Sequence, residues 1–292
     1  MADSVEHHDH LLLWPGVADR EFSSPEYAVA PFDRAVLSWN ATGAADFELE
    51  VDGVKHTMGK WGERPESRKT AAVDIDTLVL KSPAKSFRFH LHPAPGARVT
   101  LAAVTYWISR ERRPYSEIRS AAWGKVLEVP ERSQMCETKD PGAICSPASV
   151  AMVLEYYGTK RTTREVADGV FDHAGKIYGN WPFNTAYAGR DGKFTAYVRR
   201  GSGIEDLEAE IAAGRPVIIG HGWRAGELDR APIAESAGHL ITIVGFSAQG
   251  DIVVNDPAGQ PGSVRRVYNR RQIYETWLGR ASGIMYMVRP NI

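Results

Sequence analysis

The sequence is poor in cysteine, balanced in charge and without a long hydrophobic run. Of its 292 residues only two are cysteines, Cys136 and Cys145, which is too few for a disulfide scaffold. Lysine and arginine together number 35, against 36 aspartates and glutamates, so the chain lacks the basic excess that draws proteins to nucleic acid. No apolar run approaches the roughly 20 residues that cross a bilayer. We therefore expect neither a nucleic-acid partner nor a transmembrane segment.

The amino-terminal stretch carries no clear export signal. Its apolar run, Leu11–Trp14, is shorter than the roughly 7–15 residues of a signal-peptide core. The expected localisation is cytoplasmic if the sequence is complete and extracellular if a leader has been removed. His7, His8, Asp9 and His10 lie close together, but no second ligand group has the spacing of a zinc site. We expect no metal and no other cofactor.

The length predicts about two domains at roughly 150 residues each. Up to about residue 110, alternating or β-branched apolar residues are interrupted by glycine, proline and aspartate, which is typical of an antiparallel β-sandwich. The expected strands are 35–41, 47–54, 86–93 and 98–108. The charged stretch 109–120 is a candidate linker. We place the sandwich domain at 1–118 and a second domain at 119–292.

The second half of the chain combines helix and strand patterns. A helix is expected at 146–158, with Ser146 as its N-cap, one buried face, and Gly158 as a left-handed C-terminal cap. The other expected elements are a helix at 204–214 and strands at 215–220, 239–246, 251–256, 264–269 and 283–288. Helices followed by a run of strands predict an α+β domain.

Cys145 is the sharpest chemical feature of the sequence. It directly precedes the expected helix, whose free N–H groups and positive end would stabilise a thiolate. The alternative is an inert buried thiol, which is the common role of a free cysteine. Cys136 is not followed by a helix. A disulfide between the two cysteines is the less favoured alternative for a chain without a visible export signal.

Two neighbouring strands offer a base and an acid. His239 begins the first strand and Asp256 ends the second. A hairpin centred on 247–248 would place them opposite each other, with Cβ atoms about 5 Å apart, so that Asp256 could orient the imidazole. In this register Asn255 points to the other face, whereas a bulge or an odd loop would exchange the two. His221 is a rival base without a visible acid partner.

Gln134 is a candidate donor for a developing oxyanion. Its side-chain amide and the backbone N–H of Cys145 would form a two-donor hole, although a solvated loop glutamine is the more common case. Each of these residues alone is weak evidence. Their order in the chain, a glutamine, a cysteine at a helix start, a histidine on one strand and an acid after the next, indicates Cys–His nucleophilic catalysis.

Three segments, ICSPASVAMVLEYYG, GHLITIVGF and IVVNDPAG, resemble the papain-like cysteine peptidases of the bacteriocin-processing, double-glycine leader type. The resemblance is closest to the non-transporter branch and covers about residues 127–290. It implies a papain-like domain that acts on a peptide or protein. It also implies Cys145 as the nucleophile, His239 as the base, Asp256 as the orienting acid and Gln134 as the oxyanion donor.

The same resemblance extends to the stretch at 179–189, between the nucleophile and the base. It implies that Trp181 and Asn184 line the substrate cleft, while packing and capping of a loop is the alternative. The chain departs from the family in two places. Gln134 lies farther from the cysteine than in transporter-linked members, and Ser146 replaces the usual glycine after the nucleophile.

The leading hypothesis is a cysteine peptidase that hydrolyses peptide or amide bonds. The same four residues would also serve an amidase or transpeptidase that transfers the acyl group to an amine. A third hypothesis is a catalytically inactive protein whose sandwich binds a glycan or protein through an exposed Trp39 or Trp61. If these tryptophans are buried, they are packing residues instead. The sequence indicates neither the substrate nor the oligomeric state.

Overall fold

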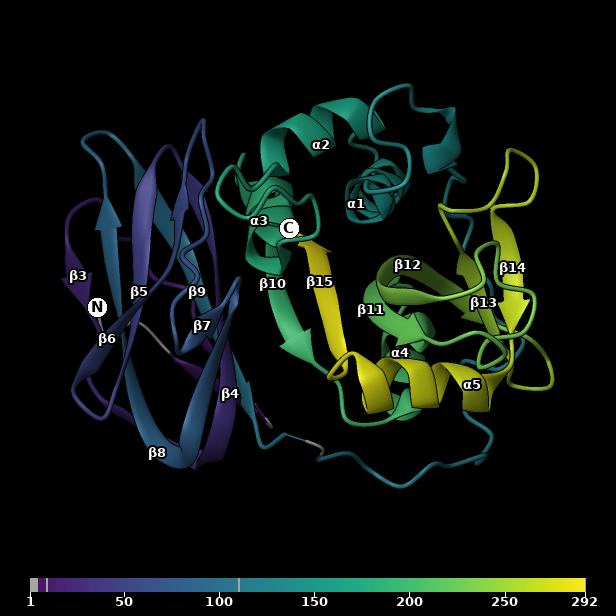
Figure 1. Ribbon diagram of the computed structural model, residues 1–292, viewed down its shortest axis with the longest axis horizontal. Helices are drawn as coiled ribbons and strands as arrows, with labels where there is room; N and C mark the ends of the chain where they lie inside the picture. Colours follow the sequence, from purple (N-terminus) through teal and green to yellow (C-terminus); the bar gives the residue numbers. More distant parts are fainter. Residues whose placement is uncertain (1–4, 9, 110, 292) are drawn as a thin grey trace. The chain divides into compact units, whose positions relative to one another are not determined.

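The computed structural model describes residues 5–8, 10–109 and 111–291. The chain divides into two compact units (Figure 1). Unit 1 consists of Met1–Ser109, Gly169–Arg200 and Met287–Ile292, and unit 2 consists of Arg110–Asp168 and Gly201–Tyr286. Residues 169–200 thus belong to unit 1 although they follow the boundary expected after residue 118. The division into domains at 1–118 and 119–292 stays a prediction.

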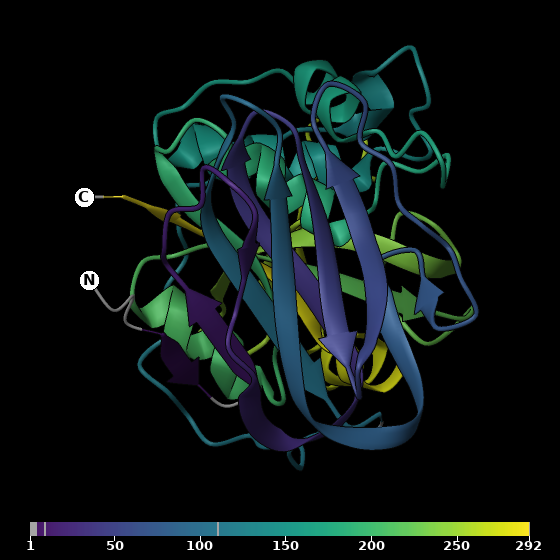
Figure 2. The same cartoon turned by 90° about the vertical axis from the view of Figure 1, so that its left-hand side faces the viewer.

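In the described part of unit 1, nine strands form an antiparallel sheet in the order β1-β2-β9-β4-β8-β5-β6, with β3 and β7 also paired to β8 (Figure 2). The strands are β1 (Glu6–His8), β2 (Leu11–Trp14), β3 (Phe22–Ser23), β4 (Tyr27–Thr42), β5 (Ala45–Val51), β6 (Val54–Trp61), β7 (Val73–Asp74), β8 (Thr77–Pro93) and β9 (Arg98–Trp107). The four expected strands are confirmed as β4, β5, β8 and β9. The expected strand 47–54 ends early, because Asp52 and Gly53 have φ of 51° and 75°, as a two-residue hairpin turn requires.

Aromatic side chains form much of the core of unit 1. Trp39 of β4 stacks on Phe47 of β5 with ring centroids 3.8 Å apart. Trp14 of β2 stacks in the same way on Phe22 of β3, at 4.7 Å. Trp39 is completely buried and Trp61 is only 7% exposed. Both are therefore packing residues and do not offer the exposed aromatic surface that the binding hypothesis requires.

A helix and a strand from the segment 169–200 complete unit 1. They are α3 (Trp181–Gly189) and β10 (Phe194–Arg200). Asn180 caps α3 by accepting a hydrogen bond from the N–H of Phe183 at 3.2 Å. Asn40 of β4 holds β10 through two bonds to the backbone of Ala196, one to its carbonyl at 2.7 Å and one from its N–H at 2.9 Å. Because these bonds are buried, β10 is an integral part of this unit.

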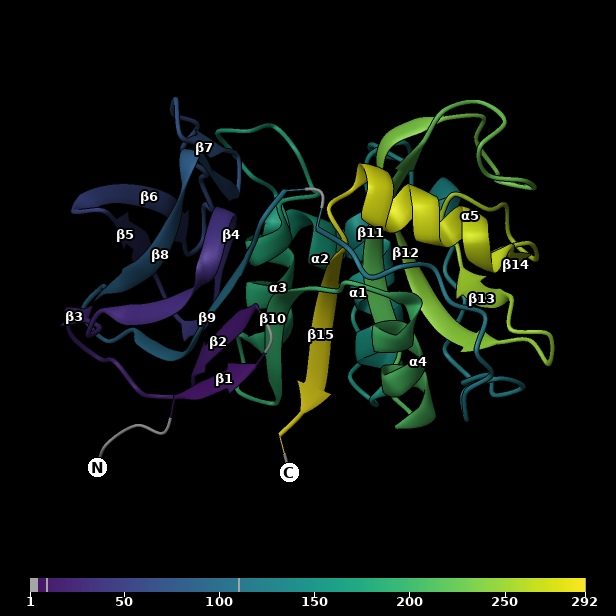
Figure 3. The same ribbon diagram turned by 90° about the horizontal axis from the view of Figure 1, so that it is seen from below.

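Unit 2 contains helices packed beside an antiparallel sheet (Figure 3). Its elements are η1 (Gln134–Cys136), α1 (Cys145–Tyr156), α2 (Thr163–Val170), α4 (Ile204–Ala212), β11 (Val217–Trp223), β12 (Ser236–Phe246), β13 (Ile252–Asn255), β14 (Arg265–Tyr268), α5 (Arg270–Tyr274), the π-helix η2 (Glu275–Arg280) and β15 (Ile284–Pro290). The last two residues of α2 and the last four of β15 are counted with unit 1. The strand order is β15-β11-β12-β13-β14, and α1 and α4 both contact β11 and β12. The predicted α+β class is confirmed.

Helix α1 differs from its prediction at its start and in its burial. It begins at Cys145, and the N-cap residue Ile144 makes no side-chain cap. Ser146 is not the cap, because its buried hydroxyl is hydrogen-bonded to the hydroxyl of Tyr286 at 3.0 Å. The helix is buried on all sides from Ser146 to Leu154, so the expectation of a single buried face was wrong. The C-terminal cap is confirmed, since Gly158 has a φ of 84°.

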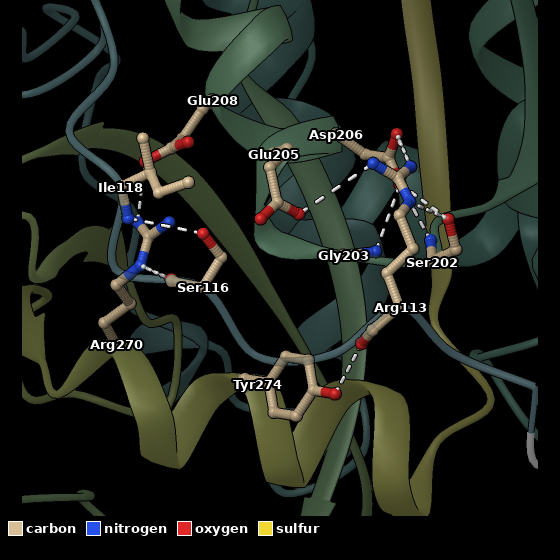
Figure 4. Close-up of polar contacts among 10 residues, drawn as sticks. All are labelled: Arg113, Ser116, Ile118, Ser202, Gly203, Glu205, Asp206, Glu208, Arg270 and Tyr274. Carbon is tan, nitrogen blue, oxygen red and sulfur yellow. Dashed lines mark hydrogen bonds and ion pairs between the residues drawn. The ribbon is translucent and has the colours of Figure 1, made fainter.

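The candidate linker is bound to unit 2 along residues 111–118, which we call the strap (Figure 4). Nη2 of Arg113 donates to both carboxylate oxygens of Asp206 at 2.8 Å. Nε of Arg270 donates to the carbonyl of Ser116 at 3.1 Å, and Nη1 of the same arginine bonds Glu208 at 2.7 Å. The side chains of Arg270 and Glu208 are each 4% exposed. Removing one partner of such a buried pair costs about 3–5 kcal/mol, so the strap is anchored on a structural ion pair.

Candidate active site

Cys145 lies half-buried at the first position of α1. Its sulfur accepts hydrogen bonds from the backbone N–H groups of Ser146 and Leu240 and from the side chain of His239. Burial works to raise the pKa of the thiol, but the charge of His239 and these hydrogen bonds outweigh it, so the pKa is lowered. The site therefore favours the thiolate, which is the nucleophilic form.

His239 of β12 is the buried partner of this thiol. It is 3% exposed, and its Nε2 lies 2.7 Å from Oδ1 of Asp256. This leaves Nδ1 as the ring nitrogen available to Cys145. Burial opposes protonation of the imidazole, but the negative charges of Cys145 and Asp256 and their hydrogen bonds raise the pKa of His239 to about 10. These charges and hydrogen bonds favour a thiolate beside an imidazolium.

Asp256, directly after β13, is a fully buried carboxylate with three hydrogen-bond donors. Besides His239, the backbone N–H of Ala258 donates to Oδ1 at 2.9 Å and the hydroxyl of Tyr268 donates to Oδ2 at 2.6 Å. Burial works to raise the pKa of Asp256, yet these bonds and the charge of His239 lower it overall. Tyr268, whose pKa is raised by burial and by the nearby carboxylate, remains a donor. Tyr268 was not singled out by any pattern beyond its place in an expected strand.

The expected hairpin register was wrong, although the two side chains do meet. Thr242 pairs with Asn255, and a bulge follows between residues 243 and 245. His239 therefore lies beyond the paired part of β13, and its backbone partner is His221 of β11. Asp256 reaches the imidazole because it follows the last residue of β13, where the chain leaves the strand, so its side chain is not confined to one face of the sheet.

Asn255, the alternative to Asp256, is used elsewhere. Its Nδ2 donates to the carbonyls of Val129 and Pro130 at 3.1 and 3.2 Å. Its Oδ1 accepts from Nε of Arg265 at 3.0 Å. This side chain therefore holds neighbouring backbone in place, and Asp256 is the residue bonded to His239.

Gln134 is buried in η1 and joined to the segment that follows Asp256. Its backbone N–H donates to the carbonyl of Pro257 at 2.8 Å. Its Nε2 donates to the carbonyl of Pro141 at 2.7 Å, and its buried Oε1 has no hydrogen-bond partner among the described residues. One of the two Nε2 hydrogens is thus engaged within the loop that precedes Cys145, and the other is available to a ligand.

Trp181 and Asn184, the two residues expected to contact substrate, belong to unit 1. The candidate catalytic residues belong to unit 2; they are Gln134, Cys145, His239 and Asp256. Asn184 is completely buried, and its Nδ2 donates to the carbonyls of Tyr178 and Asn180, both at 2.8 Å. The backbone N–H of Trp181 donates to Oδ2 of Asp76 at 3.0 Å. Both contacts fix the start of α3. A role for Trp181 and Asn184 in substrate binding stays a prediction.

Both cysteines are free, with Cys136 exposed, so the alternative of a disulfide does not apply to this structure. Within 5–8, 10–109 and 111–291, no group of three histidine, cysteine or acidic side chains is arranged to hold a metal ion. Asp9 of the amino-terminal histidine cluster lies outside the described residues. No described helix is long and apolar enough to span a membrane.

Comparison with known proteins gives one family match. The model of the Peptidase_C39 like family matches residues 126–284. No curated protein matches the sequence significantly.

Three solved structures are similar to part of the chain. A C39-like peptidase from Bacillus anthracis is 19% identical, with coverage of 57% of this chain and 99% of that one and a TM-score of 0.44. A double glycine motif protease from an AMS/PCAT transporter, in complex with its leader peptide, is 21% identical (57% and 95% coverage, TM-score 0.39). The peptidase domain of Streptococcus ComA, a bi-functional ABC transporter, is 13% identical (58% and 99% coverage, TM-score 0.38). These values are too low for residue roles to be transferred.

Proposed function

The chain belongs to the Peptidase_C39 like family and is a cysteine peptidase, a hydrolase of peptide bonds, and we propose that Cys145, His239 and Asp256 form its catalytic triad. The family resemblance noted in the sequence is thereby confirmed. One observation carries the proposal of the triad: a continuous chain of hydrogen bonds runs from the Cys145 sulfur through His239 to Asp256, at the first residue of a buried helix.

The geometry supports a two-step acyl-enzyme mechanism. The Cys145 thiolate attacks the carbonyl carbon of a peptide bond, and the His239 imidazolium protonates the departing amine. A water then attacks the thioester while His239 accepts its proton, which releases the carboxylate product and regenerates the thiolate. Throughout, Asp256 keeps the imidazole oriented and stabilises its charged form. The expected substrate is a peptide or protein.

Gln134 completes the proposed site as the oxyanion donor. Its buried Nε2 has a hydrogen to spare, and its backbone is tied to Pro257, next to the orienting acid. A preorganised N–H in a water-poor site stabilises the negative charge that develops on the carbonyl oxygen during attack. The backbone N–H of Cys145 would be the second donor.

Gln134→Ala is expected to lower kcat by about 10²–10³-fold with little change in KM, because the lost bond forms fully only in the transition state. Steady-state kinetics on a cleaved peptide measure both constants. Gln134→Glu should be at least as damaging, since an acceptor would face the oxyanion. Met135→Ala is the matched control, because the neighbouring Met135 is 42% exposed. A large rise in KM at constant kcat would assign Gln134 to ground-state binding instead.

Alkylation by iodoacetamide is expected to detect the lowered pKa of Cys145. Because that pKa is lowered, alkylation of Cys145 should remain fast at about pH 6, below the ordinary range of thiol titration. His239→Ala should abolish this reactivity at acid pH. Mass spectrometry of the tryptic peptides reads both thiols in one sample, with the exposed Cys136 as the internal reference. Equal labelling of the two cysteines near neutral pH would contradict the proposed thiolate.

Peptide hydrolysis itself is tested by incubation with a peptide library. Hydrolysis yields products with new carboxylates, and an added amine should leave the product masses unchanged. Amide products formed with the added amine would assign the chain to acyl transfer instead.

A further inference from the structure

A second imidazole, His221 of β11, lies beside the proposed base and has no role in the mechanism above. His221 and His239 are directly paired residues of neighbouring strands, and their ring centroids are 5.8 Å apart. The Trp223 ring contacts both, at 4.7 Å from His221 and 5.8 Å from His239. His221 is completely buried. The polar ring of His221 therefore lies next to the positive charge that the proposed mechanism places on His239.

The hydrogen bonds of His221 define its tautomer. The hydroxyl of Thr276, on the π-helix η2, donates its only hydrogen to the carbonyl of Ile273 at 3.3 Å. It must therefore accept from Nδ1 of His221, which lies 3.4 Å away. The proton is thus on Nδ1 and the lone pair on Nε2. That Nε2 is buried without a hydrogen-bond partner among the described residues.

His221 is uncharged. Burial is the main cause that lowers its pKa to about 3, the positive charge of His239 acts in the same direction, and the charge of Asp256 opposes them. Two adjacent imidazoles in a buried site do not both carry a positive charge. Because the carboxylate of Asp256 is bonded to His239, the charge resides on His239. His221 is therefore not a rival base but a fixed dipole beside an imidazolium.

We propose that His221, held by Thr276 as the uncharged Nδ1–H tautomer, is a positioning residue that confines the ring of His239 and favours its charged form. The proposal rests on the proposed triad. Two observations support it: the direct cross-strand pairing of the two residues, whose ring centroids are 5.8 Å apart, and a buried acceptor atom that His221 does not use for any bond of its own. A lone pair in a low-dielectric interior interacts more strongly with a nearby positive charge than it would in water.

The test compares pH profiles of kcat/KM and of Cys145 alkylation for variants of both residues. In His221→Phe the dipole is lost while an aromatic ring remains. We expect the alkaline limb, which reports the loss of the His239 proton, to move to lower pH by on the order of one unit. Thr276→Val, which keeps the side-chain shape but removes the acceptor for Nδ1–H, should move the same limb in the same direction by a smaller amount.

Two controls separate positioning from packing. Thr276→Ser keeps the hydroxyl and should retain the wild-type profile. Trp223→Phe removes the other buried N–H of this ring cluster and should leave the alkaline limb in place. If His221→Phe fails to fold, as thermal unfolding will show, Thr276→Val alone decides the question.

The outcomes distinguish this proposal from that of the triad. If Cys145 of the wild-type protein is not selectively alkylated at acid pH, the triad itself is wrong. If the wild-type protein behaves as expected but folded Thr276→Val and His221→Phe variants keep the wild-type alkaline limb, the role of His221 is overturned and the triad stands.

Discussion

Replacing Cys145 with alanine is expected to lower kcat/KM by at least about 10⁴-fold, equivalent to roughly 5.5 kcal/mol of transition-state stabilisation. The alanine variant lacks the only atom that can form the acyl-enzyme. Neither His239 nor Gln134 can replace that atom, because the roles proposed for them are to move a proton and to donate to the oxyanion. The measurement is the rate of peptide cleavage at substrate concentrations well below and well above the KM of the wild-type protein.

Cys136→Ala is the matched control, because it removes the other thiol and leaves the site intact. Cys136 is exposed, so its loss creates no cavity, and most activity should remain. Cys145→Ser keeps the size of the side chain and changes only the nucleophilic group. It should also lose activity, since an alcohol at this position is far harder to ionise than a thiol. Full activity of a folded Cys145→Ala variant would show that Cys145 is not the nucleophile. Loss of activity in Cys136→Ala would indicate that Cys136 is required.

Asp256→Asn is expected to reduce kcat/KM by about 10²–10³-fold at neutral pH. An asparagine keeps an oxygen for Nε2 of His239 and for the N–H of Ala258, so the geometry survives and the negative charge is lost. Without that charge the pKa of His239 falls and the pKa of Cys145 rises. The acid limb of the pH profile, set by thiolate formation, should therefore move up, and the alkaline limb, set by loss of the imidazolium, should move down.

Tyr268→Phe provides a graded comparison for the same carboxylate. It removes one of the three bonds to Asp256 but keeps the charge, so a loss of about tenfold or less is expected. A bell-shaped profile that narrows in Asp256→Asn and stays close to wild type in Tyr268→Phe would support an electrostatic role. Equal losses of kcat/KM in both variants, with no shift of the acid or alkaline limb, would show that the hydrogen bonds around Asp256 have only a structural role.

Local patterns in the sequence predicted the elements that depend on local physics. Alternation of apolar and polar residues located β4 and β9, and a glycine with positive φ at 158 ended α1 where expected. The helix at 181–189 was not predicted, because proline, glycine and aromatics have poor helix propensity and burial on nearly all sides leaves no amphipathic period. Asn180 caps its start, but an asparagine can be recognised as a cap only when the helix that follows it is already known.

The members of the proposed site were easier to nominate from the sequence than their geometry was to predict. Helix position and chain order singled out Cys145 and His239, but the hairpin loop is centred on residue 249 rather than between 247 and 248, and the bulge in β12 changes the register by one residue. No local signal marks either feature. Ser146 had the residue type of an N-cap, yet its hydroxyl is used by Tyr286, 140 residues later in the chain. Tyr268 and His221 likewise acquire meaning only through tertiary contacts, which a strand pattern does not encode.

The division of the chain into interleaved stretches has a consequence for proteolysis. The chain passes between unit 1 and unit 2 at 109/110, 168/169, 200/201 and 286/287. A protease that cuts a single one of these connections leaves both units covalently joined by the other three. Release of an intact unit 2 would require all four cuts, and even then its residues 110–168 and 201–286 would be separate peptides held together only by their shared core. Limited digestion should therefore give nicked protein whose fragments stay together under native conditions and separate only on denaturation.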